Sequence, residues 1–160
     1  MDRDLLLALP DDALSALCRL EFSKGSGNGG QKRNKTSSAA RVVLLEDERF
    51  AASDCSERSQ HRNRANALWK LRRLIAFELR NAPAVPPARI DCAVTHPDYP
   101  GTLAHLLDVL EENDYDHKRA AAVCGVTASA FLKLLKRDAA LWEKINAARE
   151  IRGLHKLRSN

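Results

Sequence analysis

The chain has 160 residues, of which 44% are hydrophobic, so it can bury a core and is not a wholly disordered protein. Its formal net charge is +5 and favours a polyanionic partner. The excess of positive charge is +4 over residues 1–81 and +1 over residues 82–160, so the first half is the better candidate for such contacts.

Several classes of protein and site are not expected from the composition. The four cysteines form no C-x-x-C pair and the five histidines form no H-E-x-x-H motif, so we expect no metal site and no cofactor. The first residues are acidic, unlike a targeting peptide, and the apolar run 5–9 is too short to span a bilayer. We therefore expect a cytoplasmic protein with no membrane partner.

The first half of the chain alternates between helix and strand patterns. Pro10 and two acids precede a short helix that ends at Leu17. The first strand is predicted from apolar residues that alternate with polar ones, and the long helix from apolar residues at helical spacing. The predicted ranges are 18–23, 39–45 and 49–53 for the strands and 56–80 for the long helix.

The second half is helical in pattern. Residues 81–87 contain three prolines and read as a stiff linker, and Pro97 and Pro100 are expected to break regular structure. Beyond Gly101 the predicted helices span residues 102–113, 116–123, 127–136 and 139–154.

The segment from Ser23 to Ser37 has no helix or strand pattern. Four of the seven glycines fall between Gly25 and Gly30, and glycine allows close approaches that a Cβ forbids. Five cations occur from Lys24 to Arg41 with no acidic residue among them, and cations neutralise phosphates. The pattern predicts a loop that reaches into nucleic acid.

The same glycines also fit a weaker alternative. The spacing Gly25-x-Gly27-x-x-Gly30 matches a dinucleotide-binding fingerprint, which requires a helix directly after the glycines and a parallel crossover. Neither is predicted here. A phosphate-binding Walker loop would need lysine after the last glycine, where Gln31 stands.

Two longer motifs occur in this half of the chain. The first is Ser26-Gly27-x-Gly29-Gly30-Gln31-x-x-Asn34-Lys35-Thr36-x-Ser38-Ala39-x-Arg41. The second is Glu57-Arg58-Ser59-Gln60-x-x-Asn63-Arg64-x-x-Ala67-Leu68. In this order and at this distance they resemble the catalytic domain of class I peptide chain release factors, in particular the short, codon-independent ribosome-rescue members. The resemblance covers residues 21–80.

The resemblance implies an enzyme that hydrolyses, on the ribosome, the ester joining a nascent peptide to tRNA. It assigns the catalytic role to Gly29, Gly30 and Gln31, with the Gln31 backbone N–H facing the transition state and its side chain admitting water. The segment contains no Cys, His, Asp or Glu. The chemistry would therefore rest on positioning and main-chain hydrogen bonds.

The resemblance also implies partners. Large-subunit rRNA and peptidyl-tRNA are the expected ones, and the expected RNA-binding residues are Lys24, Lys32, Arg33, Asn34, Lys35, Arg41, Arg58, Gln60 and Arg62. A solvated helix face is the alternative for the arginines of the long helix. The family's glutamine is often N5-methylated, which makes Gln31 a candidate methylation position and a glutamine methyltransferase a candidate partner.

The chain departs from the family pattern in two places. Residues 44–48 replace the usual His-x-Pro-Thr-Gly turn after the second strand. Only 28 residues precede Gly29, which leaves no room for codon-reading domains. We therefore expect release without stop-codon recognition, as in the rescue of stalled ribosomes.

Residues 118–133 resemble a Fis-type helix-turn-helix. Gly125 fits a left-handed helix stop, Val126 its apolar follower, and Thr127 the cap of the next helix. The outer side of that helix would carry Ser129, Lys133, Lys136 and Arg137. Such a helix can enter a major groove, although a bundle that only packs or binds protein is the alternative.

Short rescue factors anchor themselves with a very basic tail. Here only Arg149, Arg152, His155, Lys156 and Arg158 resemble one, interrupted by Glu150. We therefore expect a different anchoring device.

These observations predict an α+β protein. Residues 1–81 would form a release-factor-like catalytic domain, a small antiparallel sheet with a long packed helix and a projecting Gly-Gly-Gln loop. Residues 82–100 would form a Pro-rich linker, and residues 101–160 a helical helix-turn-helix-like module with a possible second nucleic-acid contact. The alternative function is a nucleic-acid-binding regulator that acts through this module.

Overall fold

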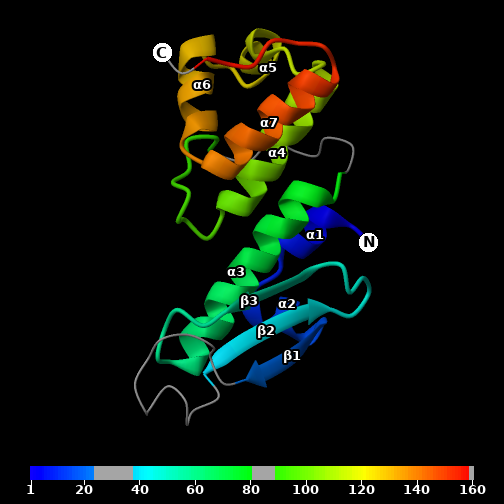
Figure 1. Ribbon diagram of the computed structural model, residues 1–160, viewed down its shortest axis with the longest axis vertical. Helices are drawn as coiled ribbons and strands as arrows, with labels where there is room; N and C mark the ends of the chain where they lie inside the picture. The colour runs from blue at the N-terminus through cyan, green and yellow to red at the C-terminus, as the bar shows by residue number, and fades with distance from the viewer. Residues whose placement is uncertain (24–37, 81–88, 159–160) are drawn as a thin grey trace. The chain divides into compact units, whose positions relative to one another are not determined.

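The computed structural model describes residues 1–23, 38–80 and 89–158 of the chain (Figure 1). The glycine-rich segment and residues 81–88 of the predicted linker lie outside the described residues. Two compact units, Met1–Leu79 and Arg80–Asn160, make up the chain. Helices and one small antiparallel sheet give the predicted α+β class. Within the described ranges, no helix is long and apolar enough to cross a membrane.

The sheet of the first unit has three antiparallel strands in the order β1-β2-β3 (Figure 1). Their bounds are Cys18–Ser23, Ala39–Leu44 and Ala51–Asp54. The first two match the prediction to within one residue. Because β1 and β2 are antiparallel, the parallel crossover of a dinucleotide-binding fold is absent from this connection.

The third strand begins two residues later than predicted. Arg49 is held in the preceding turn, where its backbone N–H donates to Asp47 Oδ1 at 3.1 Å and its guanidinium donates to the same carboxylate. Phe50 N–H donates to the Asp47 carbonyl at 3.0 Å. The turn thus extends to Phe50, and sheet pairing starts only at Ala51.

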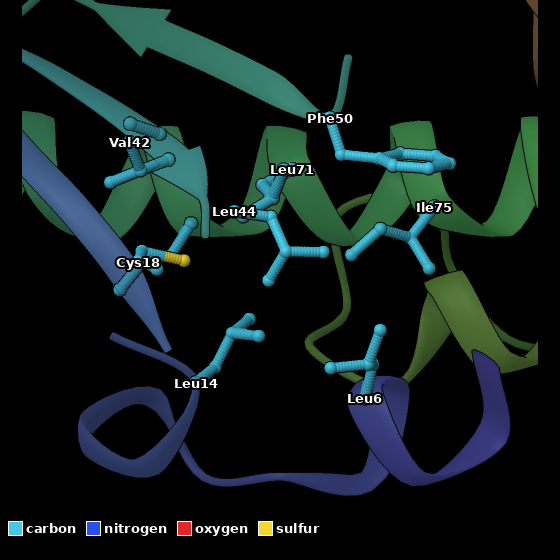
Figure 2. Close-up of a cluster of buried hydrophobic side chains, with 10 residues drawn as sticks. Leu6, Leu14, Cys18, Val42, Leu44, Phe50, Leu71 and Ile75 are labelled. Carbon is cyan, nitrogen blue, oxygen red and sulfur yellow. The ribbon is translucent and has the colours of Figure 1, made fainter. Parts of the chain in front are cut away.

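The long helix α3, Gln60–Glu78, packs against the sheet (Figure 1). Its predicted start at residue 56 was wrong, because Ser59 caps the helix and its Oγ accepts from Arg62 N–H at 3.3 Å. Apolar side chains of α3, the sheet and two short helices form one buried cluster (Figure 2). Its core residues are Leu6, Leu14, Cys18, Val42, Leu44, Phe50, Ala67, Leu68, Leu71 and Ile75.

The two short helices precede the sheet. The predicted helix is α2, Asp11–Ala16, and a further helix, α1, Arg3–Ala8, was not predicted. Asp2 caps α1 by accepting from two backbone N–H groups at 2.9 and 3.2 Å. Arg72 of α3 joins both helices, donating to Asp11 Oδ1 and to the Leu9 carbonyl, each at 2.6 Å.

The second unit contains α4 to α7, with bounds Tyr99–Glu112, His117–Val123, Ala128–Lys136 and Ala139–Ile151. The helix α4 begins three residues before its predicted start. Pro100 lies in its first turn, where a backbone N–H has no partner within the helix, so the proline does not break it. Between Arg89 and Asp98 the described residues form no helix or strand.

The turn between α5 and α6 has the predicted helix-stop geometry. Gly125 has a φ of +67°. Its N–H donates to the Ala122 carbonyl at 3.1 Å and the Val126 N–H donates to the Ala121 carbonyl at 3.0 Å, the two bonds of a Schellman motif. Thr127 then caps α6, its Oγ accepting from Ala130 N–H at 3.2 Å.

The basic residues at the end of the chain belong to the fold of the second unit. Arg149 of α7 donates to the backbone carbonyls of Tyr115 and His155. The Arg152 guanidinium lies 4.3 Å from the Tyr115 ring centroid. Leu157 is buried, and its N–H donates to Asn146 Oδ1 at 2.7 Å. Residues 153–157 are therefore tied back to α7.

Candidate functional site

The hairpin β1–β2 brings together the two ends of the glycine-rich segment. Ser23, the last residue of β1, is opposite Ala39, the first residue of β2. The end of β1 and the start of β2 lie at the end of the first unit where α3 begins (Figure 1). The predicted catalytic residues Gly29, Gly30 and Gln31 lie outside the described residues, as do Lys24, Lys32, Arg33, Asn34 and Lys35.

A buried side chain of α3 holds the return end of this segment. Asn63 has 0% exposure and lies in the first turn of the helix. Its Nδ2 donates to the Ser38 carbonyl at 2.7 Å and to the Glu57 carbonyl at 2.8 Å. Its Oδ1 accepts from the Glu57 N–H at 2.8 Å. Asn63 thereby joins Ser38, the residue before β2, to the loop that leads into α3.

The predicted RNA-binding residues of the second motif are exposed around the start of α3. Arg58 and Gln60 are exposed, and the Arg62 side chain retains 73% exposure. Arg62 Nη1 lies 3.8 Å from Glu57 Oε2, and in the described parts of the chain no ion pair forms at Arg58. These groups are accessible to a polyanion.

Arg41 is placed differently, in a surface network of charges on β1 and β2. Its Nη1 donates to Glu21 Oε2 at 2.8 Å, while Arg19 donates to Glu21 at 2.9 Å and to Glu48 at 2.7 Å. Hydrogen bonds from Arg41 and then from Arg19 lower the pKa of Glu21. A phosphate contact by Arg41 would have to compete with this exposed pair, which contributes little stability.

Sequence reasoning did not assign two polar residues at this end of the unit. One is Asn63, which lies inside the second motif but received no role. The other is Asp54, a buried carboxylate that accepts from Lys70 Nζ at 2.5 Å and from Ser56 Oγ at 2.7 Å. Burial disfavours its ionised form, but the hydrogen bonds from Lys70, Ser56 and Asn66 outweigh that effect and lower the pKa of Asp54 to about 2.

The described residues around the segment supply positioning and positive charge. No cluster of three or more His, Cys, Asp or Glu side chains able to hold a metal ion occurs among them. Asp54 is engaged by four donor groups, and its lowered pKa makes it a weak base near neutral pH, so it is poorly suited to act as a general base.

The predicted outer residues of α6 fall into two pairs. Ser129 and Lys133 are exposed. Lys136 lies over the Trp142 ring, 5.5 Å from its centroid, and Arg137 donates to Asp91. The last two are engaged within the second unit, so Lys133 is the clearest candidate on α6 for contact with a polyanion.

A domain family and several relatives match the first half of the chain. The RF-1 domain matches residues 14–91. Peptide chain release factor 2 of Paramagnetospirillum magneticum is 43% identical over 75 residues, 46% of this chain and 20% of the relative. Peptide chain release factor 1 of Paracoccus denitrificans is 43% identical over 74 residues, again 46% of this chain and 20% of the relative.

A third relative matches over a slightly longer stretch of the chain. Peptide chain release factor 2 of Campylobacter fetus subsp. fetus is 36% identical over 80 residues, 49% of this chain and 20% of the relative. The chain thus spans about a fifth of the length of the curated relatives it matches. The matched part includes the strands β1 to β3, the helix α3 and both sequence motifs.

Proposed function

We propose that this protein hydrolyses the peptidyl-tRNA ester on the ribosome, because residues 14–91 match the RF-1 domain and resemble peptide chain release factors. The match of that domain, with Gly-Gly-Gln at residues 29–31, is the observation that carries the proposal. Gly29 and Gly30 would admit a backbone shape that a Cβ forbids. The Gln31 N–H would then donate to the oxyanion that forms as water attacks the ester carbonyl.

The hairpin geometry supports this role. A segment whose ends are paired at Ser23 and Ala39 can present its middle at one end of the unit. Exposed Arg58 and Arg62 lie near the start of α3 at that end and would bind phosphates of rRNA or tRNA. The ribosome and tRNA would supply the remaining groups and exclude bulk water.

The proposal includes release without a stop codon, to rescue stalled ribosomes. In the release factor family, codon reading belongs to domains other than the Gly-Gly-Gln domain. The described residues outside the RF-1 match form α1, the start of α2 and the all-helical unit of α4 to α7. That helical unit would anchor the protein on the ribosome through nucleic acid, in place of a basic tail.

Release of a labelled peptide from three kinds of ribosome complex tests this function. The complexes carry the same peptidyl-tRNA, with an A site that is empty of message, occupied by a sense codon, or occupied by a stop codon. We expect the fastest release from the complex without message and no advantage of the stop codon. Release that depends on the stop codon would contradict the rescue role, and no release from any complex would contradict the hydrolase.

A further inference from the structure

We infer that Asn63 is a positioning residue for the reaction: it fixes Ser38, the return end of the segment that carries Gly29 to Gln31. The inference rests on the proposed function. Asn63 lies on α3 and its side chain bonds the backbone of Ser38 and Glu57, so it would act through the backbone.

The hydrogen bonds of Asn63 involve both polar atoms of its side chain. Both N–H groups of Nδ2 have an acceptor, at Ser38 and at Glu57, and Oδ1 has a donor at Glu57, all within 2.7–2.8 Å. A side chain of this size with two donors and one acceptor is available only in asparagine. Aspartate keeps the acceptor and loses both donors, and an aliphatic residue loses all three bonds.

The element that carries Asn63 is itself firmly held. One turn further along α3, Ala67 and Leu68 are buried in the core at 0% and 1% exposure. The Asn63 N–H also donates to the Ser59 carbonyl at 3.0 Å, in the first turn of the helix. The position of the Ser38 carbonyl is therefore fixed relative to the core of the unit, through α3, as well as by the pairing of β1 with β2.

The two ends of the segment are thus fixed in different ways. At Ser23 the chain leaves a strand that is paired with β2. At Ser38, which is 8% exposed, the chain enters β2 through a residue held by the Asn63 amide. A reaction that depends on backbone placement loses about 10²-fold in rate for a displacement of about 1 Å. Loss of the Asn63 donors would therefore slow the reaction at saturation more than it weakens ribosome binding.

Single-turnover peptide release by the full chain tests the inference. The rate at saturating protein and the protein concentration for half-maximal rate are measured for wild type, Asn63→Asp and Asn63→Ala. We expect both variants to lose about 10²-fold in the saturating rate. The half-maximal concentration should change less, within about twofold of wild type, because the cationic side chains of Arg58 and Arg62 are retained in both variants.

Two matched variants control for altered stability. Asn66→Ala removes an amide from the same helix, whose Nδ2 lies 3.4 Å from Asp54 Oδ1 and 3.5 Å from Ser56 Oγ, with no bond to Ser38. Ile75→Val removes one buried methyl group far along α3. Circular dichroism and thermal unfolding establish that each protein is folded at the assay temperature, and both controls should release peptide at the wild-type rate.

Three results would overturn the inference. They are an unchanged saturating rate in Asn63→Asp, an equal loss of rate in Asn66→Ala, or failure of both Asn63 variants to fold while Ile75→Val folds. The last result would assign the amide to stability alone. Absence of release by the wild-type protein would instead contradict the proposed function, so the two failures are distinguishable.

Discussion

At the scale of single residues, two buried polar side chains hold the end of the first unit where α3 begins. The Asn63 side chain hydrogen-bonds to backbone groups of Ser38 and Glu57, and the Asp54 carboxylate accepts hydrogen bonds from Ser56 and Lys70. A buried polar group is costly unless it is hydrogen-bonded, and removing one partner leaves the other unsatisfied. Substitutions at these positions should therefore affect more than the substituted residue.

The carboxylate of Asp54 should make the stability of the first unit depend on pH. Its folded-state pKa of about 2 lies below its ordinary value of 3.8. Stability from this group is therefore present above about pH 4 and is lost as the pH falls towards about 2, by up to about 2 kcal/mol. The free energy of unfolding, measured with urea at several pH values, should show Asp54→Asn losing most at neutral pH.

An exposed carboxylate provides the control. Glu21 also has a lowered pKa, but it lies in a solvated network with Arg41 and Arg19, so Glu21→Gln should change stability little at any pH. If the free energy of unfolding had the same pH dependence in wild type and Asp54→Asn between neutral pH and pH 3, the role given to Asp54 would be contradicted.

At the scale of elements, local sequence patterns predicted the helices and strands whose ends are set by nearby residues. Alternation in β1 and the glycine stop after α5 are visible within a few residues. The helix α1 was not predicted: its Asp2 cap is a local signal that was not used, and its six residues also depend on packing of Leu6 into the core, which no local pattern reveals. The Asn63 bond to Ser38 joins residues 25 positions apart, and no local pattern reveals it.

The turn between α5 and α6 gives a test of element-level chemistry. Gly125 has a φ of +67°, and a Cβ placed there would meet no atom within 4 Å. Gly125→Ala should therefore destabilise the protein by about 1–2 kcal/mol through backbone strain alone. Chemical denaturation monitored by circular dichroism measures the change.

Two other glycines serve as comparisons for Gly125→Ala. Gly153, with a φ of +71° after α7, is in the same situation, so Gly153→Ala should cost a similar amount. Gly101 lies inside α4 without a positive φ and with open space around its Cβ position. Gly101→Ala should stabilise the protein by up to about 1 kcal/mol. A stabilising Gly125→Ala would contradict the left-handed turn.

At the scale of the whole molecule, we propose different roles for the two units. The first would carry the release chemistry and the second would anchor the protein. Lys136 of α6 and Arg137, which caps the helix, are engaged by Trp142 and Asp91, so Lys133 is the exposed lysine of α6 that we expect to bind phosphate. This division differs from a helix-turn-helix regulator, for which binding to duplex DNA would be the main activity.

Salt dependence of ribosome binding tests the anchoring contact. Lys133→Ala should weaken binding at low salt and reduce the slope of log affinity against log salt by about one. Lys156→Ala is the matched control, because its ammonium is already paired with Glu150 at 3.0 Å. Identical slopes for wild type and Lys133→Ala would contradict the contact, and tight duplex DNA binding without ribosome binding would favour the regulator.

The most direct test of the whole account is release and binding measured on the same ribosomes, halted on a truncated message. Wild-type protein with Gln31 in its methylated form should free the nascent peptide. Gly30→Ala should bind equally well and release at least about 10²-fold more slowly, because a Cβ there would forbid the backbone shape proposed to direct the Gln31 N–H. No release by the wild type, or equal release by Gly30→Ala, would contradict catalysis by this segment.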